Sequence, residues 1–189
     1  MKQLILIVSV FCNFSLQANV PIEAFTFDVD LQVTNFDRYK IAKLDEASYL
    51  LKQVIQSNEF KEAILKHRFL GKRSFHFHSG MSNWKIYERI LEGAESLNKD
   101  KNNTLDAEID FFLKQDSKVI GYTRPNTHKI WINKKYFKKF NAAQLAGHLM
   151  HEWLHKLGFT HESENTQLRK YSVPYSIGRI VRELSTKLL

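Results

Sequence analysis

The chain has 189 residues, of which 43% are hydrophobic and 25% are charged. These proportions exclude a disordered chain, and the length fits one domain with a hydrophobic core of its own. The formal net charge of +8 favours anionic surfaces as partners, or serves solubility alone. Pairs of lysines flank two aromatic residues at 134–139 without any nucleic-acid-binding motif, so the sequence predicts no specific nucleic-acid partner.

Residues 1–18 have the pattern of a secretory signal peptide. A positively charged start precedes an apolar run at 4–11, which is too short to span a bilayer, and Ala18 is small, as a cleavage site requires. The sequence therefore predicts a secreted or periplasmic protein without a membrane span, and a single mature domain at 19–189. Cys12 is the one cysteine and would leave with the signal, so the mature domain would have no thiol or disulfide.

The first two thirds of the mature chain predict strands and two helices. Alternating apolar residues predict strands at 24–33, 74–78, 105–113, 118–123 and 129–133. Helical spacing predicts a helix over 45–67 with Asp45 as its N-cap, and a second helix over 82–96. In the short segment 74–78, His76 and His78 would lie on the solvent face. A turn at Pro125 would join the last two strands.

A helix with a well-marked beginning and end follows. Asn141 is its predicted N-cap, and Gln144 three residues later completes a capping box. A wide apolar stripe runs along it until Gly158, which is a typical C-terminal residue of a helix. A closing helix is predicted at 177–188. Strands with two helices, then a helix, a loop and a last helix predict an α+β domain rather than alternating βαβ units.

The stretch "HEWLHKLGFTH" contains the candidate site. His151 and His155 are four residues apart, so both imidazoles lie on one helix face and can bind one zinc ion. Gly158 allows a sharp turn after the helix, and His161 can then return as a third ligand. Three protein ligands leave a fourth position open, as in catalytic zinc sites. Glu152 can reach a zinc-activated water without binding the metal and would be the general base.

The alternative is a polar helix face with chance histidines. H-E-x-x-H alone is only moderately specific, but the added Gly158 and His161 reduce accidental matches by roughly three further orders of magnitude. His148 lies one turn before His151. We expect it at a surface position of the helix, with a supporting role beside the metal as the alternative.

The motif as a whole has the metzincin pattern H-E-x-x-H-x-x-G-x-x-H, and the sequence resembles the metzincin metallopeptidases. Phe159 and Glu162 are similar to the astacin form. The resemblance implies an N-terminal twisted mixed sheet with two long helices, a zinc-binding helix at the floor of a cleft, and a small C-terminal part ending in a helix. It implies a monomeric endopeptidase that acts on protein or peptide substrates. It also implies one catalytic zinc with three histidine ligands and a glutamate base: His151, His155, His161 and Glu152.

The resemblance also implies features around the zinc. Metzincins have a methionine in a tight turn below the metal, but no methionine follows Met150 here. The candidate turn is "YSVPYSIG" at 171–178, with Val173 or Pro174 in the methionine's place. A tyrosine beyond that turn approaches the zinc, and Tyr175 is the candidate, with a rival in Tyr171 and a buried structural role as the alternative.

The resemblance further implies a substrate-binding strand. Residues 119–123 would form an edge strand that holds the substrate backbone, and an interior strand is the alternative.

Two other functions fit the same motif. One is a basic secreted binding protein whose zinc is structural, although such sites usually have four protein ligands and the motif supplies three. The other is a zinc amidase that acts on a non-protein substrate of the cell envelope. The sequence does not separate this amidase from a peptidase.

Overall fold

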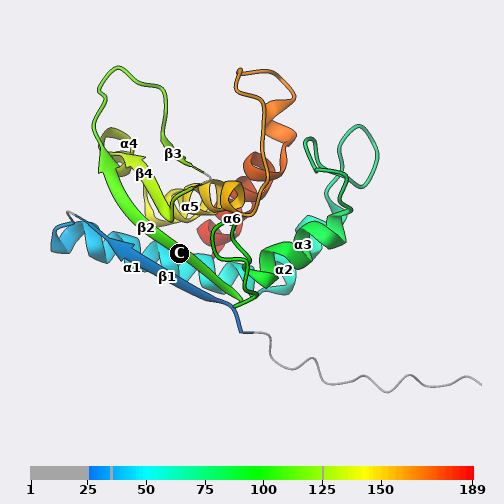
Figure 1. Ribbon diagram of the computed structural model, residues 1–189, viewed down its shortest axis with the longest axis horizontal. Helices are drawn as coiled ribbons and strands as arrows, with labels where there is room; N and C mark the ends of the chain where they lie inside the picture. Colours follow the sequence, from blue (N-terminus) through cyan, green and yellow to red (C-terminus); the bar gives the residue numbers. More distant parts are fainter. Residues whose placement is uncertain (1–25, 35, 125) are drawn as a thin grey trace, which may run out of the picture.

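The computed structural model describes residues 26–34, 36–124 and 126–189. The predicted signal peptide with Cys12, and the predicted turn at Pro125, lie outside the described residues. The described chain is a mixed α+β fold with a four-stranded mixed sheet, six α-helices and one 3₁₀ turn (Figure 1). None of the described helices is long and apolar enough to cross a membrane.

The sheet has the strand order β1-β2-β4-β3. Its strands are β1 (Asp28–Val33), β2 (Thr104–Phe112), β3 (Gly121–Thr123) and β4 (Lys129–Asn133). β1 and β4 each pair parallel with β2, and β3 pairs antiparallel with β4. Four of the five predicted strands are therefore confirmed within a few residues. The expected edge position of 119–123 is also confirmed, because β3 is the last strand of the sheet.

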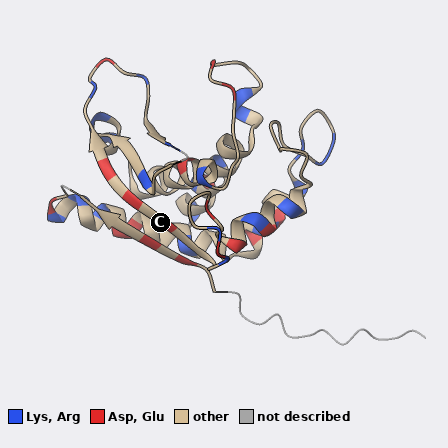
Figure 2. Cartoon of the chain, in the orientation of Figure 1, with Lys and Arg blue, Asp and Glu red and all other residues tan. Residues whose placement is uncertain are grey.

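One face of the sheet is buried and the other is polar, as the alternation of residues along β2 requires. Leu105, Ala107 and Ile109 are buried in the core, while the residues between them are only partly buried. Acidic residues mark the polar face along β1 and β2 (Figure 2). Helices α1 (Arg38–Ile55) and α5 (Ala142–Lys156) contact each other and the sheet, and they supply much of the core.

The single helix predicted at 45–67 is wrong in extent. The structure has two helices there, α1 and α2 (Asn58–Lys66), and α1 begins seven residues before Asp45. Asp37 is the actual N-cap and accepts a hydrogen bond from the Lys40 amide. The break has a local cause, because the Ser57 hydroxyl accepts from the Phe60 amide and caps a new helix.

The predicted strand at 74–78 is also wrong. Only one isolated bridge forms there, between His76 and Ser172. Phe75 is fully buried whereas Phe77 is 40% exposed, so the two phenylalanines do not share a face. Phe77 has a φ of 51°, which turns the chain away from the extended conformation. The helix predicted next is present as α3 (Asn83–Glu92), which begins after the N-cap Ser82.

Helix α5 begins and ends where its sequence signals predict. The Asn141 side chain accepts from the Gln144 amide at 2.8 Å, and the Gln144 side chain accepts from the Asn141 amide at 3.0 Å. Beyond the end of the helix, Gly158 has a φ of +90°, a left-handed conformation that glycine adopts without strain. Local sequence signals therefore determine both the first and the last residue of this helix.

The stretch 171–178 differs from the tight turn expected below the metal. Its residues begin the last helix, α6 (Val173–Leu188), which follows a 3₁₀ turn at Arg169–Tyr171. Pro174 lies in the first turn of α6, where a missing backbone N–H leaves no hydrogen bond unmade. The fixed φ of proline fits both a tight turn and the first turn of a helix, and in this structure Pro174 is in a helix. The short α4 (Lys134–Lys139) completes the set of helices.

Helices α5 and α6 touch backbone to backbone through two glycines. A Cβ on Gly147 would lie 2.5 Å from the Gly178 carbonyl oxygen, and a Cβ on Gly178 would lie 2.7 Å from the Gly147 carbonyl oxygen. The second glycine also lies against His151, since its added Cβ would be 3.2 Å from the His151 Cβ. This close approach fixes the beginning of α6 beside the histidine motif.

We predict that Gly147→Ala destabilises the fold. Overpacking costs about 1–3 kcal/mol, and the helix-propensity gain from alanine is about 1 kcal/mol. The clash should win because it involves a carbonyl oxygen that cannot rotate away, so the net loss should be about 1–2 kcal/mol. The urea midpoint of unfolding measures this, with the exposed Lys187→Ala on α6 as the control. An unchanged midpoint would contradict the prediction, because it would mean that α5 and α6 can move apart at this contact without loss of stability.

Candidate metal centre

Three histidines meet at the end of α5. His151 and His155 lie on the helix, and His161 returns from the segment that follows it. The ring centroids are 5.1 Å apart for the helical pair, 5.2 Å for His151 and His161, and 4.8 Å for His155 and His161. One ligand nitrogen from each lies within 4.8 Å of the other two. The predicted triad is therefore brought together as a group that could hold a metal ion.

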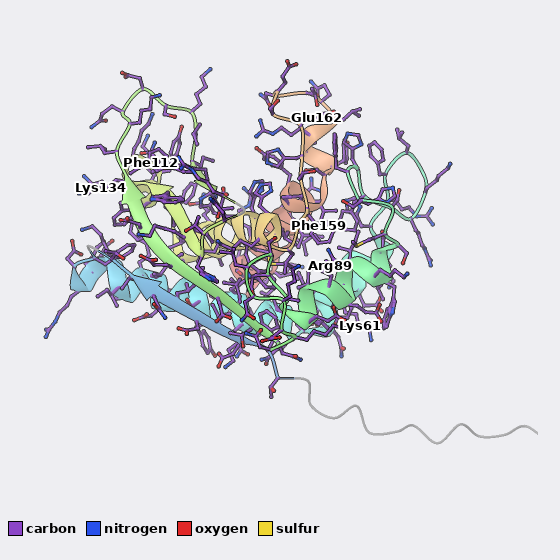
Figure 3. All side chains as sticks on the ribbon, in the orientation of Figure 1. Lys61, Arg89, Phe112, Lys134, Phe159 and Glu162 are labelled. Carbon is purple, nitrogen blue, oxygen red and sulfur yellow. The ribbon has the colours of Figure 1, made fainter. Side chains whose placement is uncertain are left out.

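The return of the chain after α5 depends on two residues. Gly158 makes the left-handed turn, and the Phe159 ring is then buried in the core at 1% exposure. The Phe159 amide also donates to the Leu154 carbonyl at 3.0 Å, which holds the segment against the helix. In Figure 3, Phe159 is labelled beside the end of α5 and Glu162 farther along the segment. His161 lies between them and is thus fixed at both sides.

In two of the three histidines, Nδ1 is paired with a backbone carbonyl. His155 Nδ1 pairs with the Phe159 oxygen and His161 Nδ1 pairs with the Glu162 oxygen, each at 2.8 Å. The backbone of Pro174 lies near His151 and partly offsets the lowering of the His151 pKa. A carbonyl oxygen requires a donating ring nitrogen. In His155 and His161 the neutral tautomer therefore leaves the Nε2 lone pair free for a metal.

Burial keeps these imidazoles neutral. It is the largest cause of the lowered pKa of all three histidines, and it lowers the pKa of His155 to about 4. Each histidine also disfavours a second charge nearby, and the neighbouring rings lower the pKa of His151 further. Metal ligands must be unprotonated, so the set is ready to bind an ion at neutral pH.

Glu152 is a buried carboxyl group next to the triad. Its residue is 4% exposed, and burial raises its pKa to about 8 in spite of the positive charge on Lys156. A carboxyl group whose pKa lies near neutrality can both accept and release a proton under ordinary conditions. The structure thus places a buried carboxyl group with a raised pKa at the position for which the sequence predicts a general base.

The surface position predicted for His148 is wrong. Its side chain is only 9% exposed, and its Nδ1 lies 3.8 Å from Glu152 Oε1. The reason is the edge strand, since Gly121 of β3 passes so close that an added Cβ would overlap His148 Nε2. That nitrogen is buried and has no hydrogen-bond partner among the described residues. His148 is therefore packed between the edge strand and Glu152.

Tyr175 lies against the triad from the first turn of α6. Its ring centroid is 4.5 Å from that of His151 and 4.8 Å from that of His161. Burial raises its pKa, so the phenol keeps its proton and can donate it in a hydrogen bond. The rival, Tyr171, packs on Phe69 with centroids 5.6 Å apart. Of the two tyrosines, the structure brings Tyr175 to the site.

A polar cluster on the core side of α5 was not predicted. Trp153 Nε1 donates to Glu95 Oε1 at 2.6 Å, and the Lys156 ammonium donates to the Thr127 carbonyl. Burial raises the pKa of Glu95 and lowers that of Lys156 to about 8. These bonds tie α5 to the loops behind it. They join residues about 30 and 60 positions apart, so no local sequence signal could have revealed them.

No family model matches the chain, and no curated protein matches it in sequence. Function is therefore inferred from the site itself. Its components are three neutral imidazoles, one buried carboxyl group and one phenol ring, which come from α5, α6 and the segment between them. Together they make a candidate metal centre with a buried carboxyl group next to it.

Proposed function

We propose that this chain is a secreted zinc endopeptidase with a metzincin-like fold, in which Glu152 is the general base. The observation that carries the proposal is the meeting of three buried imidazoles, two of which have their Nδ1 paired with a backbone carbonyl. Proteins orient histidine ligands toward metal ions in this way. The secretory part of the proposal depends on the pattern of residues 1–18.

Zinc is proposed because the type and number of donors fit it. Imidazole nitrogens suit zinc among the transition metals. Catalytic zinc sites use three protein ligands and keep one position for water or substrate, whereas structural sites usually have four. The group here has three members. When bound, zinc would polarise a peptide carbonyl and lower the pKa of a water molecule to about 7.

Glu152 would move the proton in both halves of the reaction. It would accept a proton from the attacking water and then deliver it to the leaving amine. Its burial supports the proton-delivering half of this role, because a desolvated carboxyl group holds a proton more readily than an exposed one. Tyr175 would donate its hydroxyl to the oxygen of the substrate carbonyl as negative charge develops there.

The edge strand β3 would hold the substrate backbone. β3 pairs with β4 on one side, and as the last strand of the sheet it has a second side to which an extended peptide can add. Its contact with α5 brings Gly121 against His148, one helical turn before Glu152. A peptide along β3 would therefore pass near the acid–base group.

The order of elements supports the fold part of the proposal. A mixed sheet is followed by the motif helix α5 and then by the C-terminal helix α6, and α1 packs against both helices. The departure from the metzincin pattern is the helical beginning at Val173 and Pro174, where that pattern has a methionine in a turn.

The proposal is tested with purified mature protein, residues 19–189, and a mixture of protein substrates. We expect cleavage that a chelator abolishes and added zinc restores. The absence of cleavage by zinc-loaded, folded protein would contradict the proposal. Release of products from cell-envelope material alone would support the amidase alternative instead.

We predict that Tyr175→Phe lowers kcat by at least tenfold and leaves zinc content and folding unchanged. A donor directed at a developing oxyanion typically contributes about 10²–10³ in rate, and phenylalanine keeps the ring that packs on His151. Tyr171→Phe is the matched control and should have kcat close to that of the wild type. Equal kcat in wild type and Tyr175→Phe would leave Tyr175 with a packing role only.

A further inference from the structure

A pocket adjoins the metal centre on the side of the segment between α5 and α6. Its volume is about 270 Å³. Its lining consists of Asn165, Thr166, Gln167, Arg169, Lys170 and Tyr175. Tyr175 also packs on His151 and His161, so the pocket and the triad share one wall. A group bound in this pocket would thus lie next to the proposed reaction centre.

The guanidinium of Arg169 has no anionic partner among the residues that the structure describes. Its guanidinium lies over the Tyr175 ring, 4.9 Å from the centroid. Its Nη1 makes one hydrogen bond, to the Ser163 carbonyl at 3.4 Å, while its buried Nε has no partner among the described residues. No ion pair in the described chain includes Arg169. An unpaired buried donor costs free energy, which an acceptor in the pocket would recover.

Neither of the two nearby carboxylates in the sequence neutralises Arg169, because Glu164 is exposed and in no ion pair of the described residues, and Glu162 is engaged elsewhere. Glu162 accepts a hydrogen bond from the Thr166 hydroxyl and lies 3.4 Å from His76 Nε2. The lining itself includes two cations, Arg169 and Lys170, and no acidic residue. The pocket is therefore electrically suited to an anion from outside the chain.

Arg169 is held in place before any ligand binds. Its amide donates to the Thr166 hydroxyl at 3.2 Å, and its carbonyl accepts from the Ser172 amide at 3.1 Å and the Ser172 hydroxyl at 2.8 Å. The aromatic ring below fixes the plane of the guanidinium. A planar fork of donors in a fixed orientation matches the two oxygens of a carboxylate.

We propose that Arg169 binds a carboxylate of the substrate in this pocket and makes the enzyme select peptides with an acidic group next to the cleaved bond. This inference rests on the proposed function, since it assigns a substrate class to the same site. The carboxylate comes either from an Asp or Glu side chain or from the free C-terminus of the peptide. Both present the same two oxygens to the guanidinium.

The kinetic test uses peptides that the wild-type protein cleaves, each made with Glu or Gln at every position beside the cleaved bond. At one position we expect kcat/KM to be at least tenfold higher for Glu than for Gln. In Arg169→Met this ratio should fall to near one, and Arg169→Lys should keep part of it because the charge remains. The exposed Arg38→Met on α1 removes one charge elsewhere and should keep the wild-type ratio.

A binding test separates this inference from the proposed chemistry. Acetylated Ala-Glu-Ala amide, Ala-Gln-Ala amide and Ala-Gln-Ala with a free C-terminus are titrated by NMR into folded Glu152→Gln protein. The inference is supported if the Glu peptide or the peptide with a free C-terminus binds more tightly than the amidated Gln peptide, and if this difference disappears in Glu152→Gln/Arg169→Met. Which of the two peptides binds more tightly identifies the source of the carboxylate. This result would stand even if the wild type cleaved nothing, in which case the proposed function alone would fail. Equal binding of all three peptides, or selectivity that survives loss of Arg169, overturns the inference.

Discussion

Glu152→Gln should lower kcat for peptide hydrolysis by about 10²–10⁴-fold, the typical contribution of a general acid–base group, and keep the bound metal. The reason is that Glu152 would move protons and make no metal bond, while the three imidazoles would hold the ion without it. Glutamine keeps the volume of this buried side chain, so no cavity opens beside His151. Activity and metal content are measured on the same sample. Glu152→Ala should also lose hydrolysis and keep the metal.

Glu95→Gln is the matched control for this experiment. Glu95 is also a buried carboxyl group beside α5, but it bonds Trp153 on the core side of the helix and not the histidine triad. Its hydrolysis rate should remain close to that of the wild type. Full activity in Glu152→Gln, with metal bound, would remove Glu152 from the mechanism.

His161→Ala should weaken metal binding strongly and, with it, the stability that the protein gains from bound metal. A ligand that binds only the folded state stabilises it by about 2.7 kcal/mol at 100 times its Kd. The wild-type protein should therefore gain about this much free energy of unfolding when zinc is added at that concentration. The variant should gain little, because two imidazoles on one helix hold the ion far less tightly than three.

Urea unfolding with and without zinc measures this difference. His128→Ala is the control, since His128 is not a member of the histidine group and its variant should respond to zinc as the wild type does. A His161→Ala protein with the full zinc response would show that the ion is bound elsewhere.

The parts of the fold that the sequence predicted well are those with local signals. The capping box at Asn141 and the left-handed Gly158 define α5 through contacts between neighbours in the chain. The errors arise where two local signals compete. Ser57 restarts a helix inside a continuous apolar pattern, and Phe77 leaves an alternating pattern because its φ is positive.

The same distinction applies to the site. His151, Glu152 and His155 share a helix, so their spacing alone predicts their common location. The burial of His148 depends on Gly121, which is 27 residues away along the chain and arrives through the edge strand. Such long-range packing leaves no periodic trace in the sequence.

Tyr175 illustrates an intermediate case. Its approach to the histidines was predicted from the resemblance, but its position in the first turn of a helix was not. Two facts decide that position, namely that Pro174 is acceptable at a helix start and that Gly147 meets Gly178. The pocket beside Tyr175 had no counterpart in the sequence analysis, since its residues at 165–170 follow no recognisable motif.

The most direct test of the central claim is a crystal structure of the mature protein grown with one equivalent of zinc, with the metal located by its anomalous scattering. We predict one zinc ion with the imidazole nitrogens of His151, His155 and His161 at about 2.0–2.1 Å and a fourth ligand from water, next to the Glu152 carboxylate. Zinc closed off by a fourth protein ligand, or bound away from these three histidines, would contradict a catalytic centre here.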